Sequence, residues 1–399
     1  MKLLYTVGLI TLITQGALSQ PAELLDMNTA INVAVQNNPG LKASYQQIPA
    51  AKGNLKENIV PEGPQIGVDY DDAPGDFGQR IYYAQQNIEF PLRYYYGYKA
   101  FDEQVSSAEA GYARDVFYLK LQTRNAYLDW LQAWSKLRVA EKTFDVSDDF
   151  FTQATRLYDA GEIGRIEFTR SEINLTQSQL LLDGSRNNEA MKRSALLTMM
   201  GMPASSIIKP ADSLTGLVSI TRNNFKTLFD SMIQTDIALA MQNIERYRTE
   251  LNWQRSGYLP DIILKVFKPA GEPDIGFGFG FIIPVWIFNQ QGAVQEAKAN
   301  YTASQYTYQQ RMLEISNQWY ALQSVLQLYD SRLTQYYSLL ILSRQMLDDA
   351  RTAYNAGELS YLQYLDGQQA YLQSQNQLIG MEYTYLVTVT EYYKIAGGL

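Results

Sequence analysis

The sequence contains neither histidine nor cysteine among its 399 residues. Their absence excludes a disulfide framework, a thiolate nucleophile, a lipid attached at a cysteine and a Ser-His-Asp catalytic centre. Most zinc sites also lose their usual ligands. Little conventional catalytic equipment remains, so we expect a protein that is not an enzyme, with no catalytic residues, no cofactor and no bound metal.

Long apolar runs are scarce as well. Lys2 is followed by an apolar stretch from Leu3 to about Ala17, and then by the small-x-small sequence of residues 17–19. This order is typical of a secretory signal peptide, which we predict at residues 1–19. No run of about 18 apolar residues follows it, so no transmembrane helix is expected. If the mature chain spans a membrane, it must do so as a closed barrel.

The charge balance is acidic, with 33 basic and 41 acidic side chains and a formal net charge of -8. Such a balance argues against nucleic acid as a partner, and we expect none. The apolar fraction of 46% is sufficient for a hydrophobic core. The length of 399 residues is compatible with several domains and with one elongated domain.

The two halves of the chain repeat one plan. The tripeptide Ala-Gly-Glu at 160–162 recurs at 356–358, and prolines recur at corresponding points of the two halves. We therefore predict an internal duplication with repeats at 20–215 and 216–399. Each repeat is predicted to contain a helix, two strands joined by a loop, and two long helices joined by a tight turn.

The predicted long helices carry a coiled-coil seam. One helix is expected over about 290–354 and another over about 97–159, each roughly 95 Å long at ~1.5 Å per residue. Past Gly357, apolar residues resume at seven-residue steps, which predicts an antiparallel partner helix. In the second copy the seam steps by three and four through Met312, Ile315, Trp319, Leu322, Leu326, Tyr329, Leu333, Tyr336 and Leu340.

Alternating segments predict four strands per chain. Residues 276–283 alternate phenylalanine or isoleucine with glycine, while 66–70 and 82–90 alternate apolar with mostly polar residues. The segment 262–267 fits less well, because Lys265 and Lys268 match neither face. Such alternation is typical of transmembrane barrel strands and also of one face of a soluble sheet. Since the smallest closed membrane barrels have about eight strands, a barrel would require several chains, and three would give twelve strands.

Aromatic residues gather where the strands give way to the long helices. They follow Pro91 in the first repeat and Pro284 in the second. Tyrosine and tryptophan concentrate at the boundary between a membrane and water, which favours the membrane interpretation over a soluble sheet. The predicted interface residues are Tyr94, Tyr95, Tyr96, Trp286 and Phe288.

Three segments, residues 25–41, 283–292 and 354–366, resemble the TolC family of outer-membrane efflux proteins. The first contains Asn37-Asn38-Pro39-Gly40-Leu41, the second Ile283-Pro284-Val285-Trp286 and Asn289-Gln290-Gln291-Gly292, and the third Tyr354-Asn355-Ala356-Gly357-Glu358. The 289–292 and 360–362 segments are most similar to the branch that serves heavy-metal cation efflux.

The resemblance implies a mainly α fold with a transmembrane β-barrel portion. A homotrimer would form a twelve-stranded barrel in the outer membrane of a Gram-negative bacterium, continued by a periplasmic α-helical barrel. Its partners would be a periplasmic adaptor, an inner-membrane transporter of the RND type and outer-membrane lipid. The protein would be the passive exit duct of a tripartite efflux system. The alternative is a periplasmic coiled-coil adaptor or spacer without a pore.

The resemblance also implies a periplasmic gate and two docking tips. For the gate, Glu167 and Tyr354 would be hydrogen-bonded, Asp366 would supply a ring of charge, and Gln363 stands where a second acid is usual. A solvated carboxylate is the plainer interpretation of Asp366, and a chain reversal that needs glycine is the plainer interpretation of the tips. The residues predicted to dock the adaptor are Gly161, Glu162, Ile163, Gly164, Arg165, Gly357, Glu358, Leu359, Ser360 and Tyr361.

Two further patterns are not interpreted as metal sites. An EF-hand loop starting at Asp69 would place Pro74 where glycine is required and Arg80 where glutamate is required, so calcium is rejected. The methionines at 199, 200 and 202 are predicted to pack at a helix end rather than to bind copper.

Overall fold

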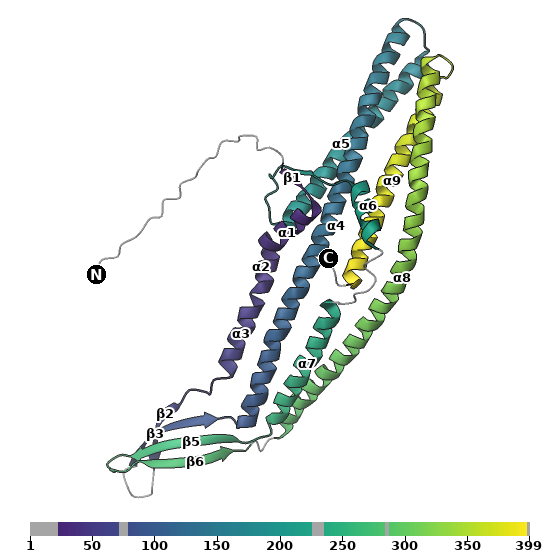
Figure 1. Cartoon of the computed structure of the whole chain (residues 1–399). Coiled ribbons are helices and arrows are strands. Elements are labelled where there is room, and N and C mark those ends of the chain that lie inside the picture. The colour runs from purple at the N-terminus through teal and green to yellow at the C-terminus, as the bar shows by residue number, and fades with distance from the viewer. Residues whose placement is uncertain (1–22, 72–78, 226–234, 284–286, 397–399) are drawn as a thin grey trace, which may run out of the picture.

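The chain forms an elongated body with a sheet at one end and two helical tips at the other (Figure 1). The computed structural model describes residues 23–71, 79–225, 235–283 and 287–396. The predicted signal peptide lies outside these ranges. Within them, the mainly helical fold with four strands in one sheet that the sequence predicted is confirmed. No helix in the described part is both long and apolar enough to cross a membrane.

Two helical hairpins form most of the body. The first consists of α4 (Pro91–Asp159) and α5 (Arg165–Met199), and the second of α8 (Ile287–Asn355) and α9 (Tyr361–Ala396). Both α4 and α8 have 69 residues, about 100 Å at ~1.5 Å per residue. Helix α4 begins before the predicted residue 97, because Pro91 lies in its first turn, where its fixed φ suits a helix and its missing N–H is not needed.

Shorter helices line the long ones. The helices α1 (Met27–Asn37), α2 (Pro39–Tyr45) and α3 (Gln47–Asn58) each pack on α4, while α7 (Thr235–Ser256) packs between α4 and α8. The single opening helix that the sequence predicts for the first repeat is thus divided. The first division occurs at Asn38, whose side chain accepts a hydrogen bond from the Leu41 backbone N–H at 3.0 Å and caps the next helix.

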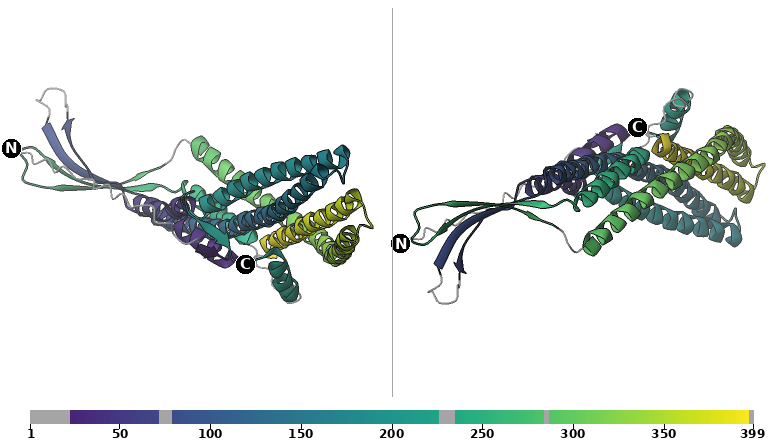
Figure 2. Two further views of the ribbon diagram at one scale, coloured as in Figure 1. Left: turned by 90° about the horizontal axis from the view of Figure 1, so that it is seen from above. Right: turned by 90° about the horizontal axis from the view of Figure 1, so that it is seen from below.

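The sheet is antiparallel, with strand order β2-β3-β5-β6. Its strands are β2 (Gln65–Asp71), β3 (Gln79–Ile88), β5 (Asp261–Pro269) and β6 (Gly276–Ile282). The pairing of β3 with β5 joins the two halves of the chain, and β2 and β6 are left as edges. Figure 2 shows the sheet extending away from the helices.

Strand β5 alternates more regularly than its sequence suggested. Lys265 is paired in register with Gln85, and its ammonium group lies 3.1 Å from the Asp69 carboxylate and 4.2 Å from the centre of the Tyr83 ring. The prediction that Lys265 matches neither face was therefore wrong, because its partners come from other strands. Lys268 is opposite Tyr82 near the end of the strand.

The main core lies midway along the body, where helices from both halves meet. Tyr127, Trp130, Leu386 and Tyr392 are almost completely buried there. Helix α6 (Leu214–Phe225) packs against α9, and the short strands β1 (Glu23–Leu25) and β4 (Ile208–Pro210) pair in parallel nearby. Strand β4 and helix α6 thus lie in this core with the C-terminal helix α9, and Met200 is a packing residue of the same core.

Candidate functional site

The two helical tips have the same backbone geometry. Gly161 and Gly357 both have φ of 76°, in the left-handed region that glycine adopts without steric cost. The Glu162 N–H donates to the Leu157 carbonyl at 2.8 Å, and the Glu358 N–H donates to the Ala353 carbonyl at 2.9 Å. These bonds close the last turns of α4 and α8. The sequence repeat at 160–162 and 356–358 therefore corresponds to a structural repeat.

The return helices begin differently at the two tips. Ser360 caps α9: its backbone N–H donates to Gln363 Oε1 at 3.0 Å, and its Oγ accepts from the Gln363 N–H at 3.4 Å. This reciprocal arrangement is a capping box, and the Ser-x-x-Gln signal was visible in the sequence. Gln363 is thus engaged at the helix start. Gly164, at the start of α5, has no side chain to make such a bond.

Four aromatic rings meet just inside the tips. Phe150 of α4 lies 6.0 Å from Tyr354 of α8, and 5.3 and 4.8 Å from Tyr361 and Tyr364 of α9, measured between ring centres. The Tyr354 and Tyr364 rings are 5.6 Å apart. We call Phe150, Tyr354, Tyr361 and Tyr364 the aromatic cluster. It connects the first hairpin to the second.

A small cavity adjoins the aromatic cluster and brings together two of the predicted gate residues. Its volume is about 20 Å³, room for about one water molecule, and its lining includes Glu167, Tyr354, Ile163 and Tyr361. Burial, and then the nearby Glu167 carboxylate, raise the pKa of Tyr354. Within the described part of the chain, the structure records no direct hydrogen bond between Glu167 and Tyr354.

The other predicted gate and tip residues are mostly at the surface of the single chain. Asp366 is exposed and does not line the cavity, so one chain does not bring it together with Glu167 and Tyr354. Ile163, Leu359 and Tyr361 are half-buried, and burial raises the pKa of the Tyr361 hydroxyl to about 12. The exposed tip residues are Gly161, Glu162, Gly164, Arg165, Gly357, Glu358 and Ser360.

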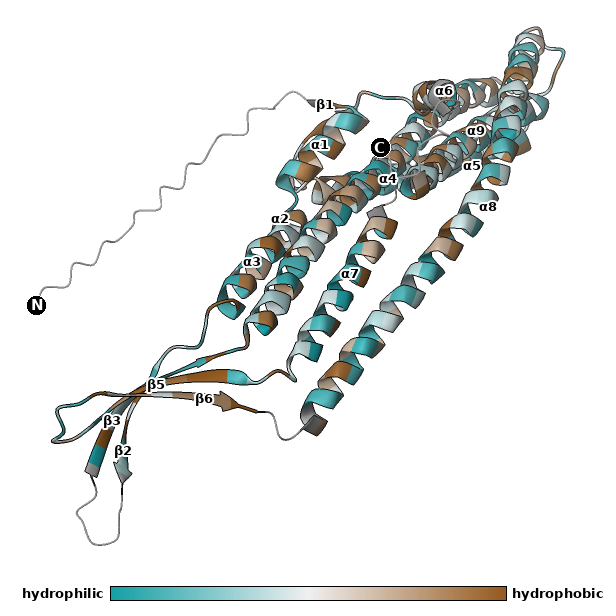
Figure 3. Ribbon diagram, turned by 60° about the horizontal axis from the view of Figure 1, so that its bottom comes forward, coloured by the Kyte–Doolittle hydropathy of each residue, from teal (hydrophilic) through white to brown (hydrophobic). Residues whose placement is uncertain are grey.

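At the opposite end, one face of the sheet is mostly apolar and open, although the register places Arg80, Gln86 and Lys268 on it as well. Figure 3 shows hydrophobic residues along the strands of this sheet. Phe279 of β6 is paired in register with Leu264 of β5, and both side chains are exposed. We call this the apolar sheet face; its exposed residues are Ile66, Val68, Tyr70, Tyr82, Leu264, Val266, Phe277, Phe279 and Phe281.

The predicted interface aromatics lie where this sheet meets the long helices. Tyr95 is exposed, with the Lys99 ammonium group 5.4 Å from its ring centre, and Tyr94 and Tyr96 are half-buried. Phe288 is exposed. Trp286 lies outside the described residues.

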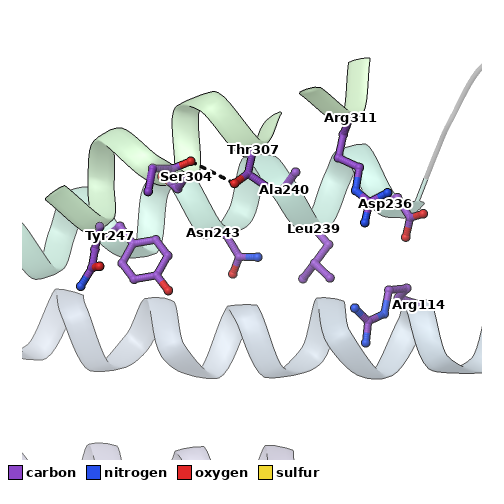
Figure 4. A pocket seen from close by; sticks show the side chains of 11 residues that line it. Arg114, Asp236, Leu239, Ala240, Asn243, Tyr247, Ser304, Thr307 and Arg311 are labelled. Atoms are coloured by element: carbon purple, nitrogen blue, oxygen red, sulfur yellow. Dashed lines mark hydrogen bonds between the residues drawn. The ribbon is translucent and has the colours of Figure 1, made fainter. Parts of the chain in front are cut away.

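A polar groove between α4, α7 and α8 contains charged residues that are already paired (Figure 4). Its volume is about 350 Å³. Arg114 and Arg311 pair with Asp115 at 3.0 Å and Glu314 at 2.8 Å, while Asp236 accepts a hydrogen bond from Tyr118 at 2.5 Å. The two ion pairs lie within α4 and within α8, whereas the Tyr118–Asp236 hydrogen bond joins α4 to α7. No group of three acidic side chains suited to a metal ion occurs among the residues that the structure describes.

A buried acid that the sequence analysis did not identify connects α6 to the second hairpin. Glu382 is only 3% exposed, and its Oε1 accepts hydrogen bonds from the Thr215 and Tyr337 hydroxyls, both at 2.7 Å. Arg222 of α6 also pairs with Asp330 of α8 at 2.6 Å. Burial raises the pKa of Glu382 above its usual value of 4.5.

The Glu382→Gln variant should be at least as stable as the wild type at pH 7. Because folding raises the pKa of this carboxyl, the folded state favours its protonated form. Its contribution to the free energy of unfolding is therefore fully present below pH 4.5 and is lost as pH rises through the folded pKa. The amide oxygen of glutamine still accepts both hydrogen bonds. Guanidinium unfolding midpoints at pH 7 and pH 5 test this: the difference between variant and wild type should shrink at pH 5. A variant that is clearly less stable at pH 7 would contradict it.

Comparisons with known proteins confirm the family resemblance. Residues 234–398 match the family described as outer membrane efflux protein. The cobalt-zinc-cadmium resistance protein CzcC of Cupriavidus metallidurans is 22% identical over 379 residues, which cover 90% of this chain and 86% of that protein. The crystal structure of the CmeC outer membrane channel of Campylobacter jejuni superposes with a TM-score of 0.76 at 15% identity, covering 93% of this chain and 85% of that chain. The structure of CusC gives a TM-score of 0.73 at 16% identity over 96% of both chains.

Proposed function

We propose that this chain, a TolC-like outer membrane efflux protein by its family match and its fold, is the outer-membrane exit duct of a tripartite efflux system. The observation that carries the proposal is the apolar sheet face at the end of a body about 100 Å long. A soluble protein rarely leaves so much contiguous apolar surface in water. A pore-less periplasmic spacer would need no such face, whereas a barrel strand in lipid does.

The edges of the sheet support assembly of three chains. With order β2-β3-β5-β6, the β2 and β6 edges have unpaired backbone groups in one chain. Three copies that join β6 of one chain to β2 of the next would close a twelve-stranded barrel in the outer membrane of a Gram-negative bacterium. The opposite face of the sheet, with Asp69, Gln85 and Lys265, would then line a polar passage. Each repeat, 20–215 and 216–399, would supply two strands and one hairpin.

Exposed apolar stripes on the hairpins support the same trimer. Ile166, Ile173 and Leu180 recur at seven-residue steps along α5, and each is exposed in the single chain. Helix α8 carries an exposed apolar group of its own at Leu339, Leu342 and Met346. Seven-residue spacing is typical of a seam between packed helices. We propose that these surfaces contact neighbouring chains and complete the helical barrel.

The proposed mechanism makes and breaks no covalent bond. An inner-membrane transporter of the RND type would supply the energy, and a periplasmic adaptor would contact the tips at 161–165 and 357–361. The tips would then dilate and substrate would pass outward by diffusion. Glu167, Tyr354 and Asp366 are proposed to lie at the constriction, where symmetry would bring three copies of each side chain around the axis and where a ring of acids favours cations.

Heavy-metal cations are the proposed substrate class, because the relative from Cupriavidus metallidurans carries cobalt, zinc and cadmium resistance in its name. The test is growth of a strain lacking this gene on graded cobalt, zinc and cadmium, compared with drugs and detergents. We expect sensitivity to at least one of these metals that the wild-type gene restores. Restoration confined to drugs or detergents would contradict the metal assignment, and restoration in no condition would contradict the efflux role.

A further inference from the structure

The aromatic cluster occupies a part of the molecule where other packing is weak. In the described part of the chain, the main core ends well short of the tips, and the second apolar cluster is small, with Leu137, Ala140 and Leu182. Tipward of this second cluster, most of the buried side chains are small or hydroxylated. These are Thr143, Ser147, Ala154, Ser171, Ser178, Ser343, Ala350 and Ser374, and the larger buried side chains are Tyr364, Leu365 and Gln368.

The small polar residues of this region do not replace the missing apolar contacts. The hydroxyls of Ser147, Ser178 and Ser374 each donate to a carbonyl of their own helix, at 2.8 to 2.9 Å. Such bonds satisfy the hydroxyl without joining one hairpin to the other. Contact between the hairpins runs mainly through α4 and α9. Near the tips, ring contacts between large side chains join the two hairpins.

In the first hairpin, Phe150 makes the ring contacts to the second hairpin. Its ring is surrounded by three tyrosine rings of the second hairpin at centre-to-centre distances of 4.8 to 6.0 Å. Aromatic pairs in this range attract each other beyond the effect of area burial. Tyr364 is buried, and burial is the main reason that the pKa values of all three tyrosines are raised, so the rings meet as neutral groups.

We propose that the aromatic cluster is a latch that holds the two hairpins of each chain together at the tips, with Phe150 as its central positioning residue. The inference rests on the proposed function as an exit duct, and it names the contact that must break when the tips dilate. The latch is uncharged, in contrast to a gate made of carboxylates. Tyr354 thus acts through ring contacts to Phe150 and Tyr364, in addition to its position beside Glu167.

The chain offers a matched control in the next residue. Phe151 is also half-buried on α4, but its ring contacts Phe168 of the same hairpin at 5.8 Å. Phe150→Ala and Phe151→Ala therefore remove the same side chain from neighbouring positions. The ring contacts of Phe150 reach the other hairpin, whereas the Phe151–Phe168 ring contact stays within the first hairpin. Phe150→Tyr retains the ring and should behave like the wild type.

The first readout is the spacing of the hairpins, which does not depend on channel activity. Because the chain has no cysteine, single cysteines at Glu162 and Glu358 can be spin-labelled without other changes. In purified protein, Phe150→Ala should broaden the distance distribution between the tips and shift it to longer values. Phe151→Ala should leave it unchanged. Equal distributions for the two variants would overturn the latch.

The second readout is conductance of the same proteins in planar bilayers. Loss of several ring contacts should raise the open fraction of Phe150→Ala by about tenfold or more, with Phe151→Ala and Phe150→Tyr near the wild type. An open fraction of Phe150→Ala equal to that of Phe151→Ala would also overturn the latch. Absence of channels from the wild type would instead overturn the exit-duct function, and the spacing measurement would still decide whether the latch exists.

Discussion

Replacing Phe279 with arginine should remove most of the protein from the outer membrane. Phe279 lies in the middle of β6, on the apolar sheet face, and is 66% exposed in the single chain. In the proposed trimer it would contact lipid, where an arginine near the bilayer midplane costs about 2–4 kcal/mol. The cost arises once in each chain and therefore three times in the barrel. We expect quantitative blots of outer-membrane fractions to show a severalfold loss of folded trimer.

The matched control for Phe279→Arg is Asn87→Arg. Asn87 follows Gln86, which is opposite Leu264, the register partner of Phe279, so the two sites lie at similar depth. The side chain of Asn87 is on the other face of the sheet, where the proposed passage contains water. Arginine there should leave membrane assembly almost unchanged. Equal effects of the two substitutions would show that the apolar sheet face does not meet lipid.

Replacing Leu180 with aspartate should prevent trimer formation while leaving the fold of the single chain intact. Leu180 is 68% exposed in one chain, so its side chain contributes little to the core of that chain. At an interface between helices, an unpaired carboxylate must be buried or protonated, and both are costly. We expect the heat-modifiable trimer band to be lost on electrophoresis and light scattering to report monomers.

Leu180→Met is the control for this substitution, because methionine preserves volume and apolarity. It should form trimers like the wild type. Normal trimers from Leu180→Asp would mean that the α5 stripe lies outside the subunit interface. Loss of helical circular dichroism in Leu180→Asp would instead contradict the claim that this residue matters only between chains.

Local patterns were enough to predict the elements that depend on near neighbours in the sequence. Alternation of period two located the strands, and the seam through Leu326 and Leu333 located α8, because each signal lies within the element itself. The repeated Ala-Gly-Glu tripeptide located both tips, since a glycine at positive φ ends each helix.

Contacts between segments that are far apart in the sequence could not be predicted from local patterns. Lys265 looked misplaced because its partners, Asp69 and Tyr83, lie on β2 and β3. Phe150 looks like any half-buried phenylalanine on a helix, and nothing in the sequence distinguishes it from Phe151. The capping role of Gln363 is different. Its signal is local, because Ser360 and Gln363 are three residues apart, and the capping box could have been predicted from them.

The combination of an open apolar sheet and two long hairpins leads to one central claim, that copies of this chain form a pore. The most direct test is to reconstitute the purified wild-type protein in planar lipid bilayers and record the current. The exit-duct account predicts discrete, uniform conductance steps from the trimeric fraction. Trimers that insert into the bilayer and conduct no ions under any applied voltage would contradict it.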